Sequence, residues 1–166
     1  VALDPQVLDL GVRGQQVGCE TIQIFTRNAN RWSSRDLTDK EIADFHQACL
    51  SIAISPVVAH SSYLINLGSP DDVLWEKSID AAITEVKRCQ VLQLSTYILH
   101  PGAHMGAGEE AGLRRITVGL DSVLEATADT QVIITLETTA GQGSSLGCTF
   151  EHLGYMIANS IMPERL

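Results

Sequence analysis

The sequence predicts an α/β fold with a parallel sheet, in the form of half of a TIM-type eight-stranded (β/α) barrel with about four strands. Four apolar, strand-like runs each precede a helix-like segment, and three of these runs end in a histidine or a glutamate. Strands that helices cover on both faces are apolar without alternation, as these runs are. An open sheet concentrates its site at a switch point, whereas a barrel collects residues from many strand ends, so we favour the half barrel.

The length and composition fit one domain over residues 1–166, since a chain of 166 residues with 45% hydrophobic content can bury a core. We find neither an apolar run near the roughly 18 residues of a membrane span nor an opening signal segment, and we expect a cytoplasmic protein without a membrane partner. The net charge of −9 argues against nonspecific nucleic-acid binding by counterion release. A bound divalent metal would offset this charge locally, so a nucleic-acid substrate stays open.

The first confident strand is residues 21–25, after a weak helical pattern in residues 1–18. A polar loop follows and carries Arg27 and Arg31. These side chains could simply be solvated, or they could contact phosphate, because they lie on the side of the barrel that carries function. Thr38 and Glu41 then form a capping box. The helix that they open has an apolar stripe consisting of Ile42, Phe45, Cys49 and Ile52.

The second strand, residues 56–60, ends in His60. Ser69-Pro70 predicts the next helix start, with a cap followed by proline at the first helical position. We expect the buried face of that helix to consist of Val73, Leu74, Ile79, Ile83 and Val86.

The third strand, residues 97–99, stops before His100 because Pro101-Gly102 cannot continue a ladder. Glu109 and Glu110 open a helix with an expected stripe of Leu113, Ile116, Val118, Leu120 and Leu124. Residues 132–136 form the fourth strand, which ends in Glu137. Thr149 caps a last helix, in which we expect Leu153, Met156 and Ile157 to face inward.

His60, His100 and Glu137 are the candidate metal ligands. They are separated in the sequence by 40 residues (60 to 100) and by 37 residues (100 to 137). Each separation is about the length of one strand, one helix and the two loops that connect them. The three side chains should therefore lie at one end of the sheet. A lone strand-end histidine is more often structural, but three ligand-type residues on successive strands favour a metal site.

The other histidines give weaker signals. His104 lies in a loop and could support the metal ligands or lie on the surface. His46 and His152 fall in predicted helices, where we expect structural roles.

Three motifs resemble, in order and spacing, the zinc-dependent apurinic/apyrimidinic endonucleases of the endonuclease IV (deoxyribonuclease IV) family, which share the xylose isomerase-like barrel. They are residues 60–68 (HSSYLINLG), 100–104 (HPGAH) and 136–143 (LETTAGQG). The similarity extends from about Thr21, with residues 23–28 (QIFTRN) also matching, to the final helix.

The resemblance implies a hydrolase of DNA repair, with up to three zinc ions in the complete barrel. Such enzymes cut the backbone of double-stranded DNA on the 5′ side of an abasic site and leave a 3′-hydroxyl. By position, His60 and His100 would bind one zinc ion, and Glu137 would bridge it to a second as the catalytic carboxylate. Tyr63 and Leu64 match the loop that enters DNA. The family has an arginine in the loop before Trp32, and Asn30 occupies the matching position in this sequence. The adjacent Arg31 is therefore the remaining DNA-contact candidate.

Family members continue for about another barrel half with further ligands. We therefore expect this chain to be a fragment or a naturally shortened relative, with one zinc ion and weak or no nuclease activity.

Two alternatives stay open. A metal-dependent sugar isomerase or epimerase could use the same strand ends, although it gives no reason for the loop of residues 63–66. A noncatalytic half barrel would cover its open sheet edges by self-association.

Overall fold

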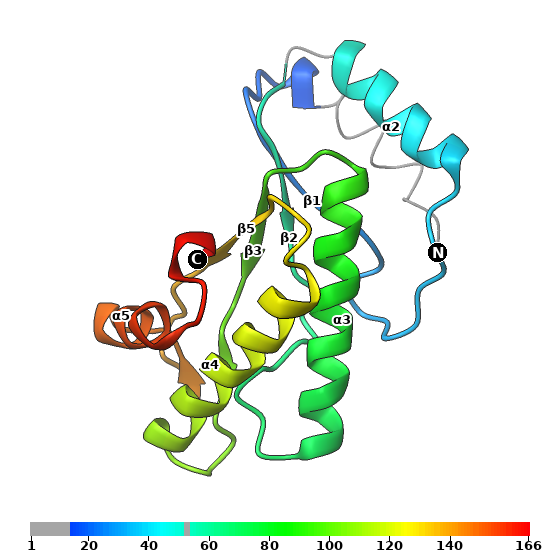
Figure 1. Ribbon diagram of the computed structural model, residues 1–166. Helices are drawn as coiled ribbons and strands as arrows, with labels where there is room; N and C mark the ends of the chain where they lie inside the picture. The colour runs from blue at the N-terminus through cyan, green and yellow to red at the C-terminus, as the bar shows by residue number, and fades with distance from the viewer. Residues whose placement is uncertain (1–13, 52–53) are drawn as a thin grey trace.

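The computed structural model describes residues 14–51 and 54–166, which form a parallel sheet with helices packed beside it (Figure 1). The sheet has the order β1-β2-β3-β5, and every neighbouring pair is parallel. This confirms the predicted fold class. The strands are β1 (Ile22–Phe25), β2 (Val57–His60), β3 (Thr96–Leu99) and β5 (Ile133–Leu136).

Helices follow the strands in alternation, and α3 and α4 lie side by side in Figure 1. The helices are α2 (Asp39–Ser51), α3 (Asp72–Val91), α4 (Glu109–Ala126) and α5 (Phe150–Asn159), and a 3-10 turn, η1 (Pro163–Arg165), follows them. The sequence did not predict the short antiparallel pair β4 (Gly102–Ala103) and β6 (Ser145–Leu146), which joins the two loops after β3 and β5. Most of the helix expected within residues 1–18, and Ile52, lie outside the described residues.

Side chains begin the helices largely as predicted. Thr38 and Glu41 form the capping box, with Thr38 N donating to Glu41 Oε2 at 2.9 Å and Glu41 N donating to Thr38 Oγ1 at 3.3 Å. Thr149 caps α5 by accepting from His152 N. The expected start of α3 was two residues early, because Asp71 is the cap and accepts from Leu74 N, while Ser69 Oγ accepts from Asp71 N.

Three residues assigned to buried faces are exposed. Val73, Val118 and Ile157 have exposed fractions of 75%, 55% and 37%. Each helical residue advances by about 100°, so Val118 lies nearly opposite Ile116 and Leu120. The prediction was wrong there because it counted apolar residues without testing their phase.

The core lies between the sheet and the helices. Ile24, Tyr97 and Ile134 from three strands are at most 2% exposed, as are Ile116 and Leu120 of α4. β1 and β5 are the outer strands of this sheet. In the described ranges, no helix is long and apolar enough to cross a membrane.

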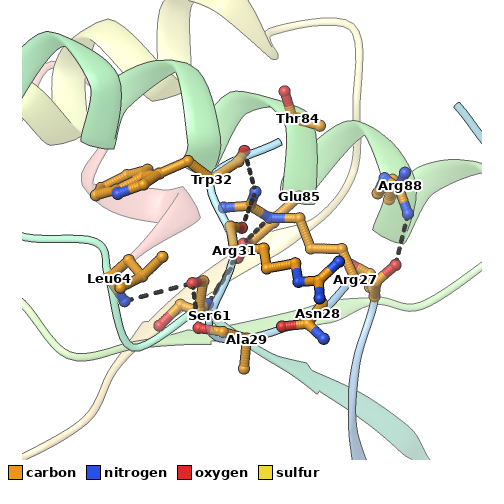
Figure 2. A network of polar contacts seen from close by, with 12 residues as sticks. Arg27, Asn28, Ala29, Arg31, Trp32, Ser61, Leu64, Thr84, Glu85 and Arg88 are labelled. Atoms are coloured by element: carbon orange, nitrogen blue, oxygen red, sulfur yellow. Dashed lines mark hydrogen bonds and ion pairs between the residues drawn. The ribbon is translucent and has the colours of Figure 1, made fainter. Parts of the chain in front are cut away.

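A buried ion pair crosses this core from β1 to α3. Arg27 Nε donates to Glu85 Oε1 at 2.5 Å, and the two side chains are only 2% and 1% exposed. Figure 2 shows Arg27 extending from the end of β1 to Glu85. The expectation of phosphate contact by Arg27 was therefore wrong, because its charge is already matched inside the protein.

Two further donors complete the surroundings of Glu85. Tyr97 OH donates to Glu85 Oε2 at 2.7 Å, and Ser62 N donates to the same oxygen at 3.1 Å. Burial, and then the negative charge of Glu85, raises the pKa of Tyr97 well above its ordinary value, so the phenol remains a donor. The carboxylate thus has a charged partner and two neutral ones, as a buried charge requires.

Replacing Glu85 should destabilise the fold. Glu85→Gln leaves the Arg27 guanidinium buried without its counter-charge, so we expect the free energy of unfolding to fall by about 3–5 kcal/mol. Urea denaturation measures the loss. Glu125→Gln on the exposed side of α4 is the matched control and should stay within about 0.5 kcal/mol of the wild type. A change at position 85 no larger than that of the control would contradict this prediction.

Candidate metal centre

Three ligand-type side chains meet at the carboxyl end of the sheet. His60 is the last residue of β2, His100 follows β3 directly, and Glu137 follows β5. The ladder continues past the strand ends, because Ser61 N donates to Ile98 O and Glu137 N donates to Leu99 O. One potential ligand atom from each of the three lies within 4.8 Å of the others. The predicted convergence is confirmed, and metal binding by these residues stays a prediction.

The main chain fixes the orientation of the His60 ring. His60 Nδ1 lies 2.7 Å from Ser61 O, and a carbonyl can only accept, so Nδ1 carries the proton. In the neutral ring, Nε2 then offers a lone pair. This is the arrangement that metal-binding histidines usually have, with the second ring nitrogen held by a carbonyl or carboxylate.

The lone pair of His60 faces another acceptor. His60 Nε2 lies 3.1 Å from Glu137 Oε2, and His100 Nε2 lies 3.7 Å from the same oxygen. With the His60 proton on Nδ1, the first of these pairs brings together two acceptors. A metal ion bound between two such acceptors would make their approach favourable.

The donor set fits zinc. Two imidazole nitrogens and a carboxylate oxygen are ordinary zinc ligands at about 2.0–2.2 Å, which corresponds to ligand separations of about 3.4 Å in a tetrahedron. The two separations that involve Glu137 Oε2, 3.1 and 3.7 Å, lie on either side of this value, and all three ligand atoms lie within 4.8 Å of one another. His60 is buried, whereas the side chains of His100 and Glu137 are 40% and 45% exposed. The group is therefore anchored in the protein interior through His60, and its His100 and Glu137 side chains are accessible to a substrate from solvent.

The DNA-contact candidates of the loop after β2 lie beside this group. Tyr63 is 65% exposed, and its ring contacts Phe25 and His60 edge-on or tilted, with centroids 5.3 and 5.7 Å away. Leu64 is half-buried, and its N–H donates to Ser62 Oγ at 3.3 Å. An aromatic ring packed on one side and exposed on the other can contact a ligand without a large loss of entropy.

Arg31 lies exposed in the loop between β1 and α2. Its carbonyl accepts from Arg27 Nη1 at 3.1 Å, and that of Trp32 accepts from the same nitrogen at 2.8 Å (Figure 2). The buried Arg27 side chain thus fixes the main chain at Arg31 and Trp32, while the Arg31 side chain is exposed.

The remaining histidines do not join the group of three. His104 Nδ1 accepts from Gly106 N and Gly108 N, both at 3.2 Å, and so shapes the turn before α4. His152 is buried in α5 and accepts from Gly147 N at 3.1 Å. The structural role expected of His152 agrees with these contacts, and nothing in them connects His104 to the three ligand-type residues.

Sequence reasoning missed Glu85 and Arg88. Arg88 Nη1 donates to Thr26 O at 2.6 Å and also contacts Arg35 O, so it fixes both ends of the loop that carries Arg31. A signal was present, because Ser78, Ala82 and Glu85 follow one another at helical spacing on the buried face of α3. An acid within such a face predicts a buried ion pair.

The family described as xylose isomerase-like TIM barrel matches residues 13–160. The "probable endonuclease 4" of Geobacter sulfurreducens is 43% identical over 153 residues, which are 92% of this chain and 52% of that protein. That of Chloroflexus aggregans is 45% identical over 141 residues, 85% of this chain and 49% of that protein. The chain spans about half the length of these relatives.

Solved structures with the same fold superpose on this chain. Endonuclease IV from Thermus thermophilus superposes with a TM-score of 0.81 at 26% identity, covering 96% of this chain and 58% of that one. A D-tagatose 3-epimerase-like protein superposes with a TM-score of 0.69 at 17% identity, covering 84% and 52%, and this likeness shows the fold alone. The chain therefore belongs to the xylose isomerase-like TIM barrel family, and the resemblance to the endonuclease IV family that its motifs indicated is confirmed.

Proposed function

We propose that this chain carries a zinc-binding part of an endonuclease IV-type phosphodiesterase, which cleaves double-stranded DNA on the 5′ side of abasic sites and leaves a 3′-hydroxyl. One observation carries the proposal: His60, His100 and Glu137 converge with acceptor atoms facing one another. The relatives named endonuclease 4 support the substrate class.

The residues have separate roles in this proposal. His60, held by Ser61 O, presents Nε2, while His100 and Glu137 complete the donor set. Zinc bound there would supply Lewis-acid chemistry suited to phosphodiester cleavage. The exposed Tyr63 ring, with Leu64 beside it, would fill an unstacked step of DNA. Arg31 on the neighbouring loop would contact phosphate.

The epimerase alternative has weaker support. The epimerase-like structure is 17% identical to this chain and supports only the fold, whereas the relatives named endonuclease 4 are 43% and 45% identical. Self-association through the outer strands β1 and β5 stays a proposal for the isolated chain.

We expect the 166-residue chain to bind one zinc ion. Removing a ligand with His60→Ala or Glu137→Gln should weaken zinc binding by more than about 100-fold, since even partners of metal ligands contribute about 10–100-fold. Competition with a chromogenic chelator measures the affinity, and elemental analysis the stoichiometry. His46→Ala removes an imidazole outside the group and should leave both unchanged. Equal affinities of the His60→Ala variant and the wild type would refute the assignment.

Incision by the isolated chain should be weak or absent. Stabilising both the attacking and the leaving oxygen takes paired metal ions, and the described residues contain one group of three ligands. Any cleavage of abasic duplex should be slow and should leave a 3′-hydroxyl. A chelator and Glu137→Gln should abolish it, and zinc should restore it only in the wild type. Rapid incision with close to three zinc ions per chain would show that ligands come from elsewhere, for example a second chain.

Tyr63 should discriminate abasic from intact DNA. A damaged, poorly stacked step is cheaper to open by a few kcal/mol, so Tyr63→Ala should weaken binding to abasic duplex more than binding to intact duplex. Fluorescence anisotropy with both duplexes measures the ratio. Tyr63→Phe keeps the ring and should retain the preference. Equal losses on the two duplexes would reduce Tyr63 to ordinary packing.

A further inference from the structure

The candidate DNA-contact residues lie on two loops that follow different strands. Arg31 belongs to the loop of residues 26–38 after β1, and Tyr63 and Leu64 belong to the loop of residues 61–71 after β2. Both loops are connected below the surface to the same carboxylate, that of Glu85 in α3 (Figure 2). The relative position of the two loops is therefore set from inside the protein.

Glu85 reaches the first loop through Arg27. Glu85 Oε1 accepts from Arg27 Nε, and the other end of the same guanidinium donates to Arg31 O and Trp32 O at 3.1 and 2.8 Å. The planar guanidinium makes this a stiff connection, because its donors point in fixed directions.

Glu85 reaches the second loop through Ser62. Ser62 N donates to the carboxylate, and Ser62 Oγ donates to Ala29 O in the first loop at 2.7 Å. The same Oγ accepts from Leu64 N at 3.3 Å. One serine thus binds Glu85, the opposite loop and the residue that follows Tyr63.

Stability alone is a weak reason for this network. A buried ion pair is often no better than apolar residues of the same volume, and its best-attested use is to specify one arrangement among several. Most of the bonds above end on the main chain of a loop, and Tyr97 supplies the remaining donor from β3.

We infer that Glu85 is a positioning residue, which acts through Arg27 and Ser62 to hold Arg31, Tyr63 and Leu64 in one arrangement beside His60. This inference rests on the proposed function for its ligand, abasic duplex DNA. The juxtaposition of the two loops can be tested without DNA.

The test uses variants that weaken the network and keep the ion pair. Ser62→Ala removes the bonds to Ala29 O and Leu64 N, and Tyr97→Phe removes one donor to Glu85. Thr117→Val is the matched control, since it removes a buried hydroxyl that donates to Leu113 O inside α4. Thermal unfolding establishes that each variant is folded under the assay conditions.

The first readout is the fluorescence of Trp32. The chain has two tryptophans, so Trp75→Phe leaves Trp32 as the sole reporter of the first loop. We expect the acrylamide quenching constant of Trp32 to rise in Ser62→Ala and Tyr97→Phe, and not in Thr117→Val. Unchanged quenching in both network variants would overturn the inference, whatever the outcome with DNA.

The second readout is the preference for abasic over intact duplex. Ser62→Ala removes two neutral hydrogen bonds, each of which contributes about 0.5–1.5 kcal/mol, so we expect the preference to fall by at least about 2-fold. In a Tyr63→Ala background, Ser62→Ala should lower the preference by a smaller factor, because only Leu64 and Arg31 are then left to position. Equal losses in both backgrounds would show that Ser62 acts through general stability and would overturn the inference.

The two readouts separate the two proposals. A wild-type chain without any preference for abasic duplex refutes the proposed function, and increased Trp32 quenching in the variants would then still support the positioning of the loop. A clear wild-type preference that survives both network variants refutes the positioning role and leaves the proposed function standing.

Discussion

The parallel register of four short strands is the constraint on which the candidate site depends. Phe25 pairs with His60, His60 with Ile98, and Leu99 with Leu136, so consecutive strands end at nearly the same level. A slip of one residue in any strand would turn its terminal side chain to the other face of the sheet. The distance of 3.1 Å between His60 Nε2 and Glu137 Oε2 thus follows from register, although 77 residues separate the two in sequence.

Features with local causes could be predicted from the sequence. The stop at Pro101-Gly102 predicted the end of β3, and Thr38 and Thr149 predicted two helix starts, because turn and cap chemistry acts within a few residues. The convergence of His60, His100 and Glu137 could also be predicted, since the carboxyl ends of the strands in a parallel sheet share one edge.

Features that depend on partners far away in sequence could not be predicted in this way. Arg27 and Arg31 lie in the same polar loop after β1, yet Arg27 is buried against Glu85 and Arg31 is exposed. The difference comes from a residue 58 positions further along the chain. The exposure of Val118 could have been predicted from helical phase, whereas the two-residue strands β4 and β6 are too short to give a pattern.

The acidity of the chain restricts how it could recognise DNA. Its net charge is −9, and the first turns of α2, α3 and α4 carry acids that interact favourably with the helix dipoles. In a β/α fold these helix starts lie toward the carboxyl end of the sheet, on the same side as His60, so the acids around the site would repel phosphate. Under the proposed function, attraction would come from a few local groups such as the exposed Arg31 and a cation between His60, His100 and Glu137. Under the proposed function, a ring such as that of Tyr63, which gains from stacking rather than from charge, would contribute the selectivity for a damaged step that the field of the whole protein cannot supply.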